Sequence, residues 1–289
     1  MLFLFPGAPA LQDLPDVTPR SSNDASLLQA FVSKSLRTAY HKQLNPAQNR
    51  ARLQPNRPRG RRPGGPVIAF ENVAYSYGGA ELLSEVSLRL APGSFHFLTG
   101  PSGSGKSTFL KLCYAELRPT AGRISIFDRD VRSLSRDDIA RTRRRIGIVH
   151  QDCQFLDHLP LAANVALPLT VTERDTAVQD LTDLLGWVGL AHLADALPPS
   201  LSGGERQRAA LARAVIIAPD VILADEPTGN VDWEMSLRLL SLLVELNRMG
   251  KTILVATHDL TLIRTAKQQV AARVLRIRNQ RVQLAGADL

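Results

Sequence analysis

The sequence is poor in cysteine and has no long apolar run. Among its 289 residues the only cysteines are Cys113 and Cys153. Two thiols cannot build a disulfide framework, so we expect a reducing compartment and two small, buried side chains. No run approaches the roughly 18–20 apolar residues of a membrane-spanning helix. The opening MLFLF is short and lacks the basic flank of a signal peptide. A function at a membrane would therefore require recruitment by a partner.

Net charge is scarce in most of the chain, although the whole sequence carries +8. Residues 1–66 contain ten Lys and Arg against three Asp and Glu, or +7, whereas residues 67–289 contain 25 against 24, or +1. An almost neutral domain is not typical of nucleic-acid binding, so no nucleic-acid partner is expected. The sequence also contains no internal repeat.

The first 66 residues differ in composition from the rest. They are rich in proline and end in QPNRPRGRRPGGP, a tract that cannot pack a core. We therefore expect residues 1–66 to form a disordered N-terminal extension. Helix-like spacing of apolar residues over 26–40 favours an alternative, a short basic amphipathic helix on a membrane surface. A further hypothesis is that translation begins at Val67, from a GTG codon.

From residue 67 onward the patterns predict an α/β domain. VIAFENV and LLSEVSLRL alternate apolar and polar residues, as half-buried antiparallel strands do. The apolar stretches SFHFLTG, RIGIVHQ, VILADEP and KTILVATHD are separated by helical patterns, which indicates a mainly parallel sheet. We expect one domain over 67–289, with a small antiparallel β subdomain first and a helical subdomain over about 155–215.

The stretch GPSGSGKS matches the phosphate-binding pattern G-x-x-x-x-G-K-[ST], between a predicted strand and a predicted helix. Its glycines let backbone N–H groups surround an anion, and the helix dipole adds to the attraction. Lys106 would bring positive charge to the β- and γ-phosphates, and Ser107 would offer a hydroxyl to Mg²⁺. The residues expected to bind nucleotide here are Gly100, Pro101, Ser102, Gly103, Ser104, Gly105, Lys106, Ser107 and Thr108.

VILADEP provides the acidic groups that a phosphate loop requires. Asp225, at the predicted strand tip, is expected to hold the Mg²⁺ shell. The side chain of Glu226 points the other way, where it could act as a general base toward water.

The heptapeptide LSGGERQ opens a predicted helix. Ser202 and Glu205 have the spacing of a capping box, and Gly203 and Gly204 leave backbone N–H groups uncovered. These features predict a second anion site, although one ATP needs only one phosphate cradle. Two alternatives remain for Ser202: it caps its own helix, or it turns toward a nucleotide.

The order of these motifs resembles that of the ATP-binding subunits of ABC transporters. The phosphate loop is followed by Gln151 after an apolar strand, LSGGERQ, VILADEP, and His258 after KTILVAT. The resemblance covers residues 67 to about 285 and implies the P-loop NTPase fold, with ATP and Mg²⁺ as cofactors. It also implies a head-to-tail homodimer, in which LSGGERQ of one chain closes over the γ-phosphate held by the other.

The resemblance further implies roles for single residues. Tyr77 would stack on adenine, with Tyr75 as the alternative. Gln151 would touch Mg²⁺ or the attacking water, and His258 would contact the γ-phosphate. The expected catalytic residues are then Glu226, His258 and Gln151, and the expected metal ligands are Ser107, Gln151 and Asp225. From the heptapeptide, the residues expected at the nucleotide are Ser202, Gly203, Gly204, Glu205 and Gln207.

Within the ABC family, the chain is most similar to the cell-division ATPases of the FtsE group. The stretches that carry this resemblance are FHFLTGPSGSGKSTFLKL, RRRIGIVHQDCQFLDHLPLAANVALPL, LADEPTGNVD and LNRMGKTILVATHDLTLI. The resemblance implies an integral membrane partner resembling FtsX, a peripheral position on the cytoplasmic face of the bacterial inner membrane, and control of peptidoglycan hydrolases. The LolD and MacB export ATPases share LADEPTGN and remain an alternative. A soluble ABC-type ATPase acting on nucleic acid is disfavoured, because this chain has one nucleotide-binding half.

Overall fold

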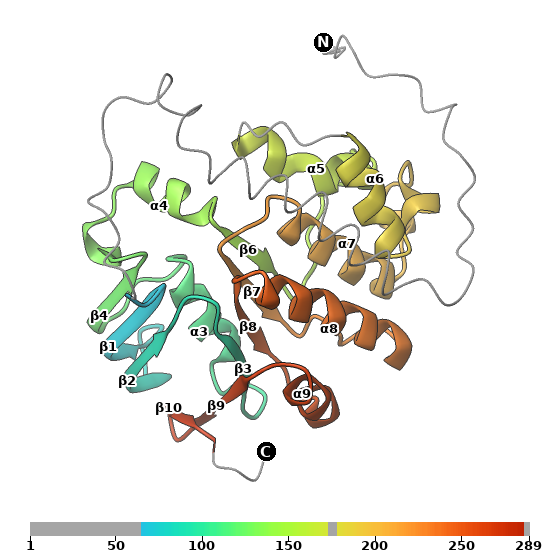
Figure 1. The fold of residues 1–289 in the computed structure, drawn as a ribbon. Helices are drawn as coiled ribbons and strands as arrows, with labels where there is room; N and C mark the ends of the chain where they lie inside the picture. The colour runs from blue at the N-terminus through green and yellow to red at the C-terminus, as the bar shows by residue number, and fades with distance from the viewer. Residues whose placement is uncertain (1–64, 173–177, 286–289) are drawn as a thin grey trace.

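The computed structural model describes residues 65–172 and 178–285, and Figure 1 shows their arrangement. Nearly all of the extension expected over 1–66, including its alternative helix over 26–40, lies outside the described residues. In the two described ranges, no helix combines the length and the apolar character needed to cross a membrane.

Six strands form a mainly parallel central sheet in the order β10-β9-β3-β8-β7-β6, as predicted. Every neighbouring pair is parallel except β9 and β10, which form an antiparallel hairpin at one edge. The strands are β3 (Phe95–Thr99), β6 (Ile146–Val149), β7 (Val221–Asp225), β8 (Thr252–Ala256), β9 (Ala272–Arg278) and β10 (Arg281–Leu284).

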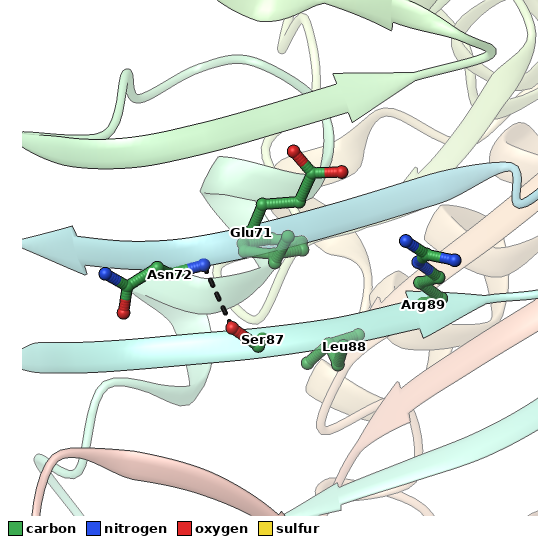
Figure 2. A pocket seen from close by; sticks show the side chains of 6 residues that line it. Glu71, Asn72, Ser87, Leu88 and Arg89 are labelled. Carbon is green, nitrogen blue, oxygen red and sulfur yellow. Dashed lines mark hydrogen bonds between the residues drawn. The ribbon is translucent and has the colours of Figure 1, made fainter.

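A second, antiparallel sheet has the order β2-β1-β4-β5 and contains the two strands predicted at the start of the domain. The strands are β1 (Ile68–Tyr75), β2 (Leu83–Leu90), β4 (Ala121–Ile126) and β5 (Arg129–Asp130). Residues of β1 and β2 line a hollow of about 660 Å³, where the backbone amide of Asn72 donates to Ser87 Oγ at 2.9 Å (Figure 2). Its other lining residues are Phe70, Glu71, Leu88 and Arg89, and none of them belongs to the expected site.

Helices cover both faces of the central sheet. The α-helices are α3 (Lys106–Cys113), α4 (Arg136–Arg143), α5 (Leu161–Thr172), α6 (Val178–Trp187), α7 (Gly203–Val215), α8 (Trp233–Arg248) and α9 (Leu260–Lys267). Short 3₁₀ turns occupy Val131–Ser133, Ala191–Leu193 and Pro198–Ser200. Figure 1 shows α3 beside the antiparallel sheet, with α5, α6 and α7 grouped at the other end of the molecule.

The apolar residues of the central strands divide between two cores. In β7, Val221 and Leu223 pack with α3 and the antiparallel sheet, where the ring of Phe70 stacks on that of Phe109 at 4.8 Å. The alternate residues, Ile222 and Ala224, pack on the other face with α5 to α9. Burial on both faces explains why VILAD is continuously apolar. The alternation expected of β1 is wrong, because every residue of this strand except Glu71 and Asn72 is buried.

Candidate nucleotide-binding and hydrolysis site

The phosphate loop lies between β3 and α3, as predicted. Gly105 begins α3 in a left-handed conformation (φ +100°), and a Cβ built on Gly103 would meet nothing within 4 Å. Lys106 Nζ donates to the carbonyl oxygens of Gly100, at 2.9 Å, and Pro101, at 3.2 Å. Ser104 Oγ is buried without a hydrogen-bond partner among the described residues. An open loop, a cation and an unpaired hydroxyl suit a phosphate group.

The expected metal ligands gather where two neighbouring strands end. Asp225 ends β7, is only 7% exposed, and accepts a hydrogen bond from the Ser107 side chain. Burial raises the pKa of Asp225, while the Ser107 hydrogen bond and the charge of Lys106 oppose that rise. Gln151 follows β6, which runs parallel to β7, so both residues leave the sheet at the same edge. Carboxylate, hydroxyl and amide oxygens are ligands that suit Mg²⁺.

The structure also brings together the expected base and the expected switch histidine. Glu226 Oε1 lies 2.9 Å from His258 Nδ1, although 32 positions separate the residues. They follow the adjacent strands β7 and β8, and the Glu226 side chain is 15% exposed while that of His258 is 78% exposed. Both line a cavity of about 400 Å³, together with Thr228, Gly229, Thr257, Asp259 and Leu260. A carboxylate at the edge of a solvent-filled hollow has access to water.

The two tyrosines expected near adenine differ in exposure. Tyr77 is 64% exposed, and its hydroxyl lies 3.2 Å from Thr108 Oγ1, next to the phosphate loop. Tyr75 is 7% exposed and packs in the core, where it contacts the Tyr77 ring edge-on at 4.9 Å. Only Tyr77 therefore presents its ring to solvent, which favours it as the adenine platform.

The capping box predicted in LSGGERQ is present. Ser202 Oγ accepts from the Glu205 amide at 3.4 Å, and the Glu205 carboxylate accepts from the Ser202 amide at 2.7 Å. Two hydrogen bonds donated to the carboxylate, from the Ser202 backbone amide and the Ser202 hydroxyl, lower the pKa of Glu205. Of the two alternatives for Ser202, the structure has the one in which it caps its own helix, α7.

Adjacent glycines in the heptapeptide have different neighbours. A Cβ on Gly203 would lie no closer than 3.8 Å to any atom, whereas a Cβ on Gly204 would lie 2.8 Å from the backbone oxygen of Asn230. Gly204 therefore permits a close contact with the loop after β7, and Gly203 leaves an open surface.

Gln207 does not join the exposed residues of the heptapeptide. It is 2% exposed, its Nε2 donates to the Glu226 carbonyl at 3.0 Å, and its Oε1 accepts from Cys153 Sγ at 3.1 Å. The sequence does not predict this connection or the part that Cys153 has in it. Helical spacing was the available signal, because Gln207 precedes buried Ala210, Leu211 and Ala214 by three, four and seven positions.

Comparisons with known proteins agree with this geometry. The profile of the family described as ABC transporter matches residues 83–229. The cell division ATP-binding protein FtsE of Haemophilus influenzae is 44% identical over 202 residues, covering 68% of this chain and 92% of its own length. FtsE of Bacillus subtilis is 39% identical over 209 residues, covering 71% and 92%.

A solved structure is also similar. It is the dimeric, post-hydrolysis state of the ATP-binding cassette MJ0796 bound to ADP and Pi. Its TM-score is 0.68 at 32% identity, and the match covers 75% of this chain and 96% of that one. The phosphate loop, the acidic end of β7, the family profile and these relatives lead to one conclusion: the chain belongs to the ABC transporter family, as an ATP-binding cassette.

Proposed function

We propose that this chain is the ATP-hydrolysing subunit of an FtsEX-like complex in bacterial cell division. The observation that carries the chemistry is the Glu226 carboxylate, held 2.9 Å from His258 beside the phosphate loop and Asp225. The relatives named as cell division ATP-binding proteins, at 36–44% identity and over at least 90% of their own length, support the biological assignment.

In the proposed mechanism the loop around Gly103 cradles the phosphates of ATP. Lys106 exchanges its hydrogen bonds with the Gly100 and Pro101 carbonyls for the more favourable pairing with phosphate oxygens. Ser107, Gln151 and Asp225 would hold Mg²⁺, which neutralises phosphate charge when bound.

Glu226 then accepts a proton from the attacking water as a general base. His258 Nδ1 donates to the Glu226 carboxylate and orients it. The γ-phosphate is the proposed second partner of the ring, at Nε2, and because phosphate oxygens accept, this contact requires a proton on both ring nitrogens. Tyr77 supplies the flat, exposed surface on which adenine stacks.

The second half of each site comes from a second copy of the chain. Ser202 and Gly203 are exposed at the N-terminus of α7, and no nucleotide is needed to satisfy the capping box of that helix. We propose that this surface closes over nucleotide held by a partner chain in a head-to-tail homodimer. The dimeric state of the MJ0796 cassette supports this assembly.

The proposed membrane partner resembles FtsX, which places the cassette peripherally on the cytoplasmic face of the inner membrane. Purification of the tagged chain from membranes of its own host, followed by identification of the bound permease, tests this assignment. Recovery of an FtsX-like protein supports it. Recovery of a lipoprotein-export or macrolide-export permease instead would replace it with the LolD or MacB alternative.

The chemistry is tested by Glu226→Gln. The variant should bind ATP with unchanged affinity, lose about 10²–10⁴-fold in kcat, and accumulate as an ATP-bound dimer, because the amide cannot accept the proton. Glu234→Gln, which changes an exposed carboxylate in the first turn of α8, is the matched control and should retain wild-type turnover. Wild-type kcat in Glu226→Gln would refute the assignment of the base.

A further inference from the structure

The backbone of Glu226 has a conformation that few residues other than glycine adopt. Its φ is +48°, in the left-handed region. The backbone is strained there, because glutamate carries a Cβ that glycine lacks. This conformation determines where the carboxylate leaves the chain after β7. Some other part of the structure must therefore hold the backbone in place.

Three hydrogen bonds hold the peptide groups on either side of Glu226. Its amide donates to the Ala256 carbonyl at 2.9 Å, and its carbonyl accepts from the Gly229 amide at 3.2 Å. The third donor is Gln207 Nε2, at 3.0 Å, and it is the only side chain among the three partners. A substitution can remove this third bond without changing the backbone of the loop.

The Gln207 amide has one orientation that satisfies both of its ends. The Glu226 carbonyl can only accept, so the NH₂ group must face it, and Oε1 then faces Cys153. The Cys153 thiol lies 3.1 Å from Oε1 and 3.5 Å from the His150 carbonyl, so its shorter contact is with Gln207.

We propose that Gln207 is a positioning residue for hydrolysis, which holds the Glu226 backbone so that the carboxylate meets His258. The same side chain joins three segments: the loop after β6 through Cys153, helix α7, and the end of β7. Gln207 thus acts within its own chain, four residues beyond Gly203, the last residue of the surface proposed to face the partner's nucleotide. The inference rests on the proposed role of Glu226 as the base.

Gln207→Met tests this inference, because methionine keeps the length and most of the volume of the side chain but cannot donate to the Glu226 carbonyl. We expect kcat for ATP hydrolysis to fall at least about tenfold while KM and the dissociation constant for ATP stay within about twofold of wild type. Gln207→Asn keeps the amide but shortens the side chain, so it should also lower kcat while leaving KM and the dissociation constant for ATP unchanged. It provides a second test if the methionine variant folds poorly.

Asn247→Leu is the matched control. The Asn247 amide also bridges two backbone carbonyls, those of Gly93 and Lys251, at the far end of α8. This variant should lose thermal stability with little change in kcat. If Gln207→Met and Gln207→Asn reduce kcat only in proportion to their loss of folded protein, the role of Gln207 is structural and the proposal is wrong.

A double-mutant comparison separates this proposal from the function on which it rests. In the Glu226→Gln background, Gln207→Met should cause no further loss of kcat, because its effect acts through the carboxylate. An equal fold-loss in both backgrounds would overturn the positioning role while leaving Glu226 as the base. Wild-type turnover in Glu226→Gln alone would instead remove the proposed mechanism.

Discussion

Gly203 and Gly204 are adjacent in the sequence, but alanine should affect them in opposite directions. A Cβ on Gly204 would lie 2.8 Å from the Asn230 backbone oxygen, a distance that requires the loop after β7 to move. Overpacking of this kind costs about 1–3 kcal/mol. A Cβ on Gly203 would lie at least 3.8 Å from its neighbours, and Gly203 is the first residue of α7. Gly203→Ala should therefore gain at most the roughly 0.5–1 kcal/mol by which alanine exceeds glycine in the middle of a helix.

Thermal unfolding without nucleotide, followed by circular dichroism, measures the difference between the two variants. Both share the helical gain, so overpacking alone should separate them by about 1–3 kcal/mol, or about 2–12 °C in Tm for a domain of this size. Gly203→Ala should be the more stable variant, and it should nevertheless lose ATPase activity, because the added methyl group enters the surface proposed to close over the partner's nucleotide. Equal Tm values for the two variants would refute the reasoning from the Asn230 contact.

Two further predictions concern His96 and Tyr77. His96 is 3% exposed, and its Nδ1 has no hydrogen-bond partner in the described ranges. Burial, together with the charge of Arg273, lowers its pKa from 6.5 to about 4. Between these two pH values the unfolded chain therefore binds a proton at His96 that the folded chain does not. Urea unfolding at several pH values should therefore show the free energy of unfolding falling by up to about 3 kcal/mol as pH decreases through this window. His96→Leu should remove this contribution of His96, and an unchanged pH dependence in the variant would contradict the prediction. Tyr77→Ala should raise KM for ATP with little change in Tm, whereas Tyr75→Ala should lower Tm by several degrees because Tyr75 is in the core; the reverse pattern would identify Tyr75 as the adenine platform.

The local parts of the site were predictable because each depends on a short stretch of sequence. The phosphate loop, the acid pair after an apolar strand and the Ser202–Glu205 capping box are set by residues within eight positions of one another. The fully buried central strands were predictable for the same reason, since VILAD and TILVA are continuously apolar. The burial of β1 was not, because its side chains are covered by segments distant in the sequence. The 2.9 Å contact between Glu226 and His258 is not predicted by the sequence, because strand order is decided by packing across the whole sheet. The family resemblance implies only that His258 contacts the γ-phosphate.

The remaining features depend on how distant segments pack together. The left-handed backbone at Glu226 has no signature in LADEP, because glutamate rarely adopts it and nothing local requires it. Gln207 was assigned to the nucleotide on family resemblance, whereas its burial follows from the packing of α7 against the core. Cys153 is a small buried side chain, as expected. Its hydrogen bond to Gln207 could not be predicted from the sequence, because the two residues are 54 positions apart.

The first turns of α7 therefore have two faces with different partners. Ser202 and Gly203 are exposed, whereas Gly204 and Gln207 contact the segment that begins at Glu226 in the same chain. A rotation of α7 that brought the exposed face onto a partner's nucleotide would also displace the Gln207 amide from the Glu226 carbonyl, unless the segment after β7 moved with the helix. Gly204 packs closely against this loop, since an added Cβ would lie 2.8 Å from the Asn230 backbone oxygen, so we expect the helix and the loop to move together. In the proposed mechanism, closure of the dimer and placement of Glu226 are therefore linked through α7.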